Sequence, residues 1–323
     1  MAPSAQKLER KYLKIDRAAE KARRQKTATA PATGAQTALT RTLWGDAVRR
    51  LLKNKLAVMG FCWIVIIVIV ALSADLWVVQ ALGDPTAVDP TSSRLAPSAL
   101  HPFGTDMLGR DVMSRVVYGA RVSLMVGVIA TAIALVSGLI LGSLSAYFGG
   151  IWDAIIMRLG DIFLSFPYVL FVIAMLAVLG PGFINVFIAI GLLGWTSIAR
   201  VLRSSILQVK ESDYVSAARA LGAGHLRIIL RHILPNSLAS VIVYGTMSIG
   251  SAIITESALS FLGLGIQPPT PSWGLMIAEG QTQLMAGQWW LTVFPGLAIL
   301  LTVLSFTLLG DGLRDALDVK ETD

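Results

Sequence analysis

The sequence predicts an all-α integral membrane protein with six transmembrane helices and with both termini in the cytoplasm. Apolar residues make up 54% of the 323 and charged residues only 15%, and the mean hydropathy is +0.68. A soluble domain has about a quarter of its residues charged, so this composition indicates a membrane protein. Six apolar runs have the length of roughly 20 residues that a helix needs to cross about 30 Å of hydrocarbon.

The apolar runs define the predicted spans. They are Leu56–Val79, Val122–Ala146, Ile162–Leu179, Phe183–Ala199, Leu238–Phe261 and Leu291–Leu309. Only Gly180-Pro181-Gly182 separates the third span from the fourth, which predicts that the two are antiparallel neighbours. Pro167 lies five residues into the third span, and we expect it to kink that helix and to serve as a hinge.

The distribution of charge predicts the orientation. Residues 1–55 hold fourteen Lys and Arg against four acids, and the loop 200–236 is also basic. The loop 262–290 has no Lys or Arg and one acid, Glu279. The positive-inside rule therefore places the N-terminus and the basic loop in the cytoplasm. A nucleic-acid partner could also explain a basic tail, but the neighbouring span and the lipid bilayer explain it more simply.

Three regions follow from this reading. Residues 1–40 form a basic cytoplasmic extension, in which 5–26 has the pattern of an amphipathic helix. Residues 41–120 hold an interfacial elbow helix, the first span and an outer loop. Residues 121–323 form a five-helix core that includes the cytoplasmic loop 200–236. The first apolar run begins too far along the chain for an ordinary secretory signal, so we expect a retained anchor.

The sequence contains no motif for catalysis or for nucleotide binding. It lacks G-x-x-x-x-G-K, G-x-S-x-G and H-E-x-x-H, and its three histidines and one cysteine predict no metal site. We therefore expect no enzyme activity and no cofactor in this chain. The rival class is a self-sufficient secondary carrier or channel. Such carriers usually need several ionisable groups within the membrane, and here only Glu256 lies clearly inside a span.

The segment 213–236 interrupts the apolar pattern and predicts a docking element. Tyr214, Ala217, Ala218 and Leu221 follow helical i, i+3, i+4 and i+7 spacing, and Gly222 provides a helix stop. An ordinary basic loop would explain the charges but not this small-residue face. The residues that support the segment are Arg219, Arg227, Arg231 and Pro235, and a second helical stretch is expected from about His225 to just before Pro235.

The same segment resembles the EAA loop of binding-protein-dependent ABC importer permeases, whose pattern is E-A-A, three residues, G, nine residues, I-x-L-P. Ala217-Ala218, Gly222 and Leu234-Pro235 keep that spacing, whereas Ser216 replaces the Glu and His232 the Ile. The stretches HPFGTDMLGRDVMSRVVYGARVSL, ESALSFLGLG and GDGLRDAL resemble other parts of the dipeptide/oligopeptide branch, C-type subunit.

The resemblance implies a type I ABC importer permease fold in a bacterial or archaeal cytoplasmic (inner) membrane. It implies a B-type permease as heterodimer partner, two cytoplasmic ATPase subunits that bind ATP and Mg, and an extracytoplasmic solute-binding protein. The short helix in 213–222 would then receive the closure of the ATPases. Di- and oligopeptides are the implied solutes, and the same branch also serves nickel chelates, glutathione or oligosaccharides.

Four further residues are candidates for the outer side or an outer gate: Asp106, Arg110, Asp111 and Glu256. We expect Arg110 and Asp111 to form local ion pairs. The outer loop either contacts the external binding protein or forms a self-satisfied cap. Glu256 pairs either with an Arg or backbone group at the gate or makes a structural bond near its helix end, where a charge costs less than at mid-membrane.

Overall fold

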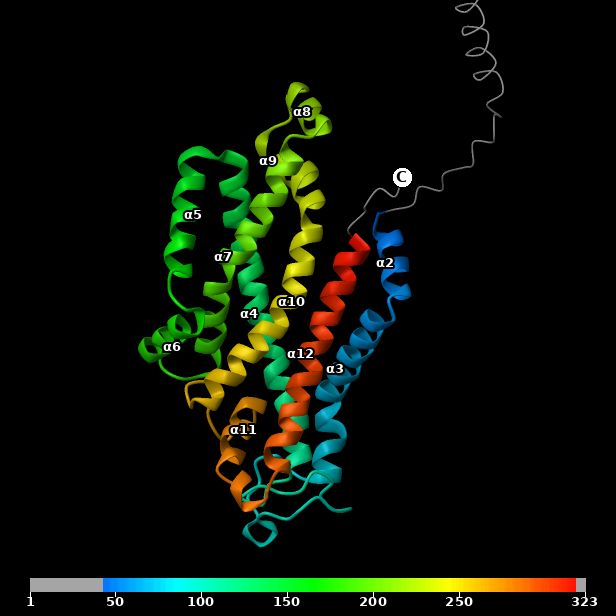
Figure 1. Cartoon of the computed structure of the whole chain (residues 1–323), viewed down its shortest axis with the longest axis vertical. Helices are drawn as coiled ribbons and strands as arrows, with labels where there is room; N and C mark the ends of the chain where they lie inside the picture. The colour runs from blue at the N-terminus through cyan, green and yellow to red at the C-terminus, as the bar shows by residue number, and fades with distance from the viewer. Residues whose placement is uncertain (1–42, 318–323) are drawn as a thin grey trace, which may run out of the picture. The chain divides into compact units, whose positions relative to one another are not determined.

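The computed structural model describes residues 43–317, and the described residues from Ala47 onward belong to one compact unit. The predicted extension 1–40 and its amphipathic helix lie outside the described residues. Within the described part every regular element is helical, apart from an isolated bridge between Thr105 and Asp111 (Figure 1). The elbow segment is α2 (Leu43–Lys53), whose Arg49 and Arg50 are exposed.

Five helices are long and apolar enough to cross a membrane, and a bent pair makes a sixth crossing if it is counted as one span. The five are α3 (Lys55–Leu82), α4 (Val112–Phe148), α7 (Phe183–Lys210), the helix 225–261 that ends in α10 (Leu234–Phe261), and α12 (Trp290–Leu317). The bent pair is α5 (Gly150–Leu164) and α6 (Tyr168–Leu179). The predicted boundary at 120/121 falls inside α4.

Short elements connect these helices. They are α8 (Asp213–Ala220), α9 (His225–Ile228), the π-helical turn η2 (Ile229–Ile233), α11 (Trp273–Gln281), and the 3-10 turns Pro90–Ser92 and Leu284–Ala286. In Figure 1, α8 and α9 lie at one end of the bundle, toward which α3 begins and α12 ends, and the loop before α4 and helix α11 lie at the opposite end.

The prediction of one kinked helix over Ile162–Leu179 is wrong. α5 begins directly after α4, ends at Leu164, and is followed by a break before α6, where the chain bends by 89°. Pro167 has no backbone N–H to donate, and its ring keeps the preceding Phe166 out of the helical region. Pro167 therefore stops one helix and starts the next, which is a larger change of direction than a kink.

The core is built around the close packing of α4 against α7, which two glycines permit. A Cβ atom on Gly142 of α4 would lie 2.9 Å from the Ala199 carbonyl oxygen, and one on Gly191 of α7 would lie 2.8 Å from the Ala130 carbonyl oxygen. Helices in a membrane gain little from burying apolar faces, so close approach at small residues supplies much of their association. The two backbones therefore meet with no side chain between them.

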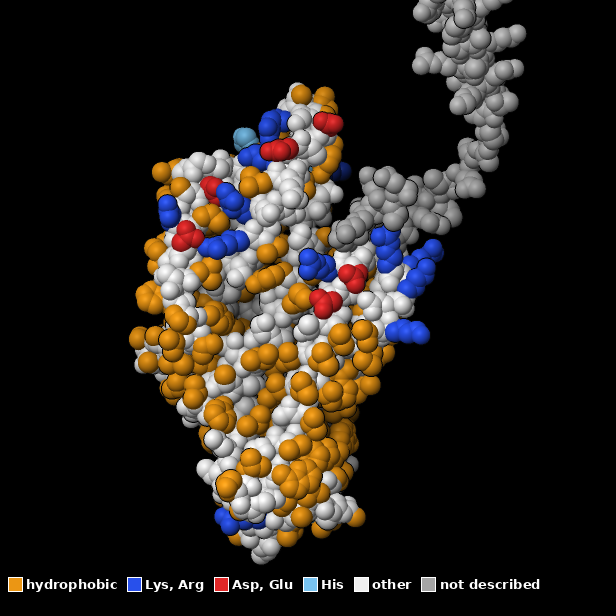
Figure 2. All heavy atoms as spheres, in the orientation of Figure 1, with side chains coloured by type: hydrophobic (Ala, Val, Ile, Leu, Met, Phe, Trp, Pro, Cys, Tyr) orange, Lys and Arg blue, Asp and Glu red, His pale blue; other side chains and the backbone are white. Residues whose placement is uncertain are grey.

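The surface of the bundle has separate apolar and charged regions. Figure 2 shows, on one face, hydrophobic side chains over most of the bundle, and Lys, Arg, Asp and Glu gathered toward the end with α8 and along α2. Many of the large apolar side chains of α3 are exposed, for example Leu72 and Leu76, both more than 70% exposed. An apolar belt of this kind matches the hydrocarbon of a bilayer.

The α4–α7 contact yields a stability prediction. Gly191→Ala places a methyl group against the Ala130 backbone, and overpacking of this kind lowers the free energy of unfolding by about 1–3 kcal/mol. Gly296→Ala is the matched control, because no atom lies within 4 Å of a Cβ at that position of α12. Thermal unfolding of the purified chains in detergent checks this. Equal melting temperatures for the two variants would contradict the packing argument.

Candidate functional site

The segment 213–236 forms a short helix, a turn and the start of a long helix. α8 ends at Ala220, and Gly222 follows with φ +78°, a left-handed conformation that glycine adopts without strain. The predicted stop before Pro235 is not a break, because helix 225–261 continues through it. The Leu234 N–H donates to the Ile229 carbonyl oxygen, which is an i to i−5 bond. The helix therefore continues into the proline through one π-helical turn.

Two contacts fasten this segment to α4 and α7, and a third joins the ends of those two helices to each other. Val215 is fully buried in an apolar cluster with Ile206 of α7 and Ile228 of α9. Lys210 Nζ donates to the Tyr147 carbonyl oxygen at 2.7 Å and covers the C-terminal carbonyls of α4, where a cation is favoured. The Tyr147 hydroxyl and His225 Nδ1 are hydrogen-bonded at 2.7 Å. A force on α8 is therefore passed to α4 and α7.

The predicted docking residues lie on the outside of this fastened segment. Tyr214 is 46% exposed and Leu221 is 89% exposed, Ala217 and Gly222 are exposed, and Ala218 is half-buried. Leu221 lies just beyond the end of α8, so the shared helical face is that of Tyr214, Ala217 and Ala218. The result is an apolar surface at the end of the bundle where charged side chains also gather.

Sequence reasoning missed two exposed leucines and the buried anchor of this surface. Leu226 is 69% exposed and Leu230 is 56% exposed, beside the predicted docking residues in the chain. Their i, i+4 spacing on a short basic helix was the available signal. Val215 carried no sequence signal of its own, because its burial depends on residues from α7 and α9.

The supporting residues are solvent-facing. Arg219, Arg227 and Arg231 are exposed and make no ion pair with any residue from 43 to 317. Pro235 lies in the first turn of α10. The three guanidinium groups are therefore available to an acidic partner or to lipid headgroups.

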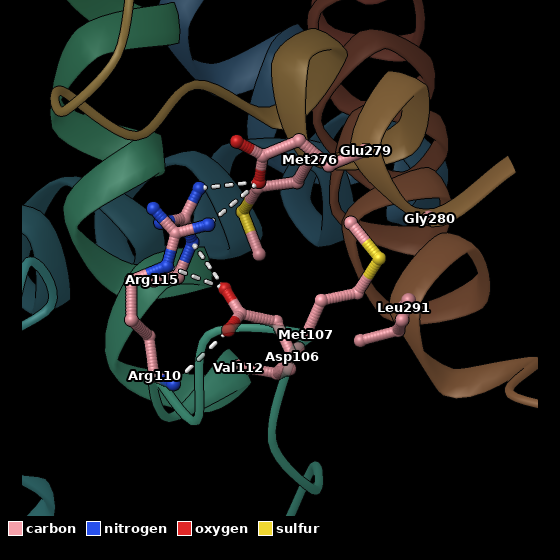
Figure 3. A pocket seen from close by; sticks show the side chains of 9 residues that line it. All are labelled: Asp106, Met107, Arg110, Val112, Arg115, Met276, Glu279, Gly280 and Leu291. Atoms are coloured by element: carbon pink, nitrogen blue, oxygen red, sulfur yellow. Dashed lines mark hydrogen bonds and ion pairs between the residues drawn. The ribbon is translucent and has the colours of Figure 1, made fainter. Parts of the chain in front are cut away.

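At the opposite end, two arginines and two acids from distant parts of the chain form one cluster (Figure 3). This outer cluster, named after the predicted outer loops, consists of Asp106, Arg110, Arg115 and Glu279. Arg110 donates to Asp106 at 2.6 Å and to Glu279 at 3.1 Å, and Arg115 donates to Glu279 at 2.8 Å. Arg115 Nε also lies 3.7 Å from Asp106. The charges balance, and the cluster joins the outer loop and the start of α4 to α11. Its small cavity of about 20 Å³ has room for a single water molecule.

Arg110 and Asp111 each form an ion pair within the outer loop, as expected, but with different partners and not with each other. Asp111 instead caps α4 by accepting from the Ser114 N–H at 2.8 Å, and it pairs with His101 Nδ1 at 2.9 Å. The physical reason is that the helix begins directly after Asp111, which commits its carboxylate to the helix start and separates it from Arg110. The self-satisfied form of the outer loop is the one that these contacts favour.

Arg115 and Glu279 were not among the predicted site residues. A signal for them existed, because Glu279 is the single acid in an otherwise uncharged outer loop and must find a cation on the same side of the membrane. The arginines of the first outer loop were the candidates. Which of them it meets depends on how α11 packs against α4, where Trp273 Nε1 donates to the Val116 carbonyl oxygen at 2.9 Å.

Glu256 pairs with serine hydroxyls and with no arginine among the described residues. It is fully buried, and it accepts from Ser260 at 2.7 Å and from Ser123 of α4 at 3.4 Å. These bonds link α10 to α4. Of the two roles expected for Glu256, they fit a structural bond and not a pairing with an Arg at a gate. Within 43–317, no three His, Cys, Asp or Glu side chains come together as metal ligands would.

Comparison with known proteins decides the family. Residues 138–322 match the model of the binding-protein-dependent transport system inner membrane component, and residues 42–97 match the N-terminal TM domain of oligopeptide transport permease C. The chain belongs to this family of inner membrane permeases. It is thus a multi-pass membrane subunit of a transporter and not a catalytic enzyme, and the predicted C-type dipeptide/oligopeptide branch is confirmed.

The permease has relatives along most of its length. It is 43% identical over 277 residues to the dipeptide transport system permease protein DppC of Alkalihalophilus pseudofirmus, covering 86% of this chain and 90% of the relative. It is 43% identical over 280 residues to the glutathione transport system permease protein GsiD of Escherichia coli, covering 87% and 91%.

Solved structures agree on the fold. The MetNI methionine ABC transporter in inward-facing conformations matches with a TM-score of 0.52 at 18% identity, covering 63% of the permease and 97% of that chain. An amino acid ABC transporter matches with a TM-score of 0.50 at 15% identity, covering 63% and 94%. At this identity the likeness shows the fold alone, and it confirms the predicted ABC importer permease fold.

The outer cluster yields a second stability prediction. Arg115→Gln removes a charge that is 1% exposed and leaves Glu279 and Asp106 with one arginine fewer, which costs about 3–5 kcal/mol for a buried network. Arg158→Gln is the control, because Arg158 is 84% exposed and its partner Asp161 lies 3.9 Å away, and such pairs contribute about 0–1 kcal/mol. Thermal unfolding should show a clearly larger loss for Arg115→Gln. Similar losses would mean that the cluster is not a buried brace.

Proposed function

We propose that the permease is the C-type subunit of an ATP-driven importer of peptides. Relatives of about 43% identity are named as permeases for dipeptides and for glutathione, and each of these solutes is a short peptide. Nickel chelates and oligosaccharides, which the family resemblance also allows, have no such support among these names. Peptides are therefore the favoured solute class.

The observation that carries the proposal is the exposed apolar surface of α8 and α9 on a segment fastened to α4 and α7. Apolar side chains such as Leu221 and Leu226 gain nothing from exposure to water, and they lie beside arginines that exclude a position in hydrocarbon. A protein partner resolves this conflict. The positive-inside rule places that partner in the cytoplasm, where an ATPase subunit would dock.

The proposed complex contains a B-type permease, two ATPase subunits and an extracytoplasmic solute-binding protein. ATP and Mg²⁺ would be held by the ATPase subunits, and this chain would need no cofactor of its own. Asp106, Arg110, Asp111 and Glu256 would then keep the outer end rigid. The solute-binding protein would meet the permease at that end.

The proposed mechanism runs through the fastened segment. Closure of the ATPases would push on Tyr214–Gly222, with Ala217 and Ala218 allowing close approach. Val215 would pass the movement to α7 and His225 would pass it to α4, and the access of the solute path would alternate. The break at Pro167, where α5 and α6 meet, is a place where the bundle could flex without breaking helical hydrogen bonds.

A pair of substitutions on α8 tests this function. In proteoliposomes that hold the assembled complex, Ala218→Glu should reduce ATP-driven peptide uptake at least tenfold while insertion is unchanged, because a bulky charge separates the docked surfaces. Gly222→Glu should act in the same direction, since φ +78° strains any residue with a Cβ atom. The measurements are uptake, ATP hydrolysis and the amount of permease in the membrane.

Ser216→Glu is the matched control, because it adds the same side chain to the same helix at an exposed position where the family pattern has Glu. It should leave uptake within about twofold of the wild type, as surface substitutions usually do. Normal uptake in Ala218→Glu and Gly222→Glu would refute docking at this surface. Uptake driven by an ion gradient without ATPase subunits would show the rival class, a secondary carrier.

A further inference from the structure

A hollow lined with hydroxyl groups lies between α4, α7, α10 and the break before α6. Its volume is about 250 Å³, and eight of its sixteen lining residues are Ser, Thr or Tyr, whereas none is Asp, Glu, Lys or Arg. Thr131 of α4 lies in its wall, sixteen residues after Arg115 of the outer cluster and sixteen before Tyr147 of the docking end. The hollow is therefore about halfway along α4.

Half of these hydroxyl groups are satisfied within the bundle. Thr196, Ser248 and Thr255 donate to carbonyl oxygens of their own helices, and Tyr168 donates to the Ile190 carbonyl oxygen. Such bonds to the preceding turn are the ordinary way in which a helix satisfies a Ser or Thr side chain. These four groups need no ligand.

The other half have no partner in the described part of the chain. Thr131 Oγ1 is fully buried, with the residue 4% exposed, and no hydrogen bond reaches it. The hydroxyls of Ser197, Tyr244 and Ser251 also line the hollow without a hydrogen bond to any residue of 43–317. A buried hydroxyl without a partner is unfavourable, so Thr131 indicates a missing ligand or water.

The chemistry of the lining selects the kind of ligand. A hydroxyl both donates and accepts a hydrogen bond, as the N–H and C=O groups of a peptide amide require. A net charge would find no counter-charge here, and burying it uncompensated is costly. Since sites for small ligands usually measure about 300–1,000 Å³, a hollow of about 250 Å³ holds part of a solute and leaves the rest to the second permease.

We propose that this hollow is a solute-contacting part of the translocation path and that its unpaired hydroxyls bind the amide groups of a passing peptide. This inference rests on the proposed import of peptides. It goes beyond that function by assigning specificity to the membrane subunit itself, at Thr131, Ser197, Tyr244 and Ser251, in addition to the external binding protein.

The test compares an amide with an ester. Proteoliposomes with the assembled complex and its binding protein are given labelled trialanine and the analogue in which one amide is an ester, which lacks one N–H donor. Thr131→Val keeps the shape and removes the hydroxyl, and it should lower the ratio of kcat/KM for amide over ester by about threefold to tenfold. The binding protein is common to all samples, so a change in the ratio belongs to the permease.

Two variants act as controls. Thr246→Val makes the same change on α10, where Thr246 donates to the Ile242 carbonyl oxygen and lies outside the hollow, and it should keep the wild-type ratio. Thr131→Ser retains a hydroxyl and should restore the ratio. If Thr131→Val fails to assemble, Tyr244→Phe removes one hydroxyl oxygen alone and is judged by the same ratio.

The outcomes separate the two proposals. Intact uptake with an unchanged ratio in Thr131→Val and Tyr244→Phe would overturn the hollow as a solute site and leave water as its occupant, while peptide import would stand. If the wild-type complex with ATP takes up neither compound, peptide import fails and this inference fails with it.

Discussion

The close backbone contact between α4 and α7 is the constraint on which the rest of the molecule depends. Lipid tails are as apolar as leucine, so membrane helices associate through close packing and polar contacts. Gly142 and Gly191 let these two backbones touch. The outer cluster is attached to the start of α4, the docking segment to the far ends of α4 and α7, and the hydroxyl-lined hollow opens between them. One pair of helices thereby connects all three.

Several polar pairs join neighbouring helices, and they determine which helices move together. Asp153 of α5 accepts two hydrogen bonds from Arg203 of α7, each 2.6 Å long. Glu256 of α10 bonds to Ser123 of α4. The bonds of Glu256 are fully buried and costly to break, whereas the Arg203–Asp153 pair is partly exposed and contributes less. Together with the α4–α7 contact, these bonds mean that α4, α5, α7 and α10 should respond as one body to a force on α8. Arg115 extends that body to α11 at the outer end.

The sequence predicted what depends on local pattern and missed what depends on packing. Apolar length located the spans, and the small-residue face of 213–222 located the exposed end of the docking segment. Pro167 predicted a bend, but not one of 89°, because a proline interrupts a helix without fixing the angle at which the next helix starts. Arg110 and Glu279 are 169 residues apart, and Val215 is buried by residues of α7 and α9. No local pattern carries such contacts.

The distance between the two ends of this body shows whether α8 and α7 move together. Spin labels on Ser216→Cys and Ile184→Cys, both exposed, mark the docking end and the opposite end of α7 once Cys62 is replaced by Ser. Pulsed electron spin resonance on the assembled complex gives their separation with and without bound ATP. If the body is rigid, one narrow distribution is expected that ATP leaves unchanged, in a complex that still transports. A shift or broadening with ATP would show that α8 moves independently of α7 and would contradict that rigidity.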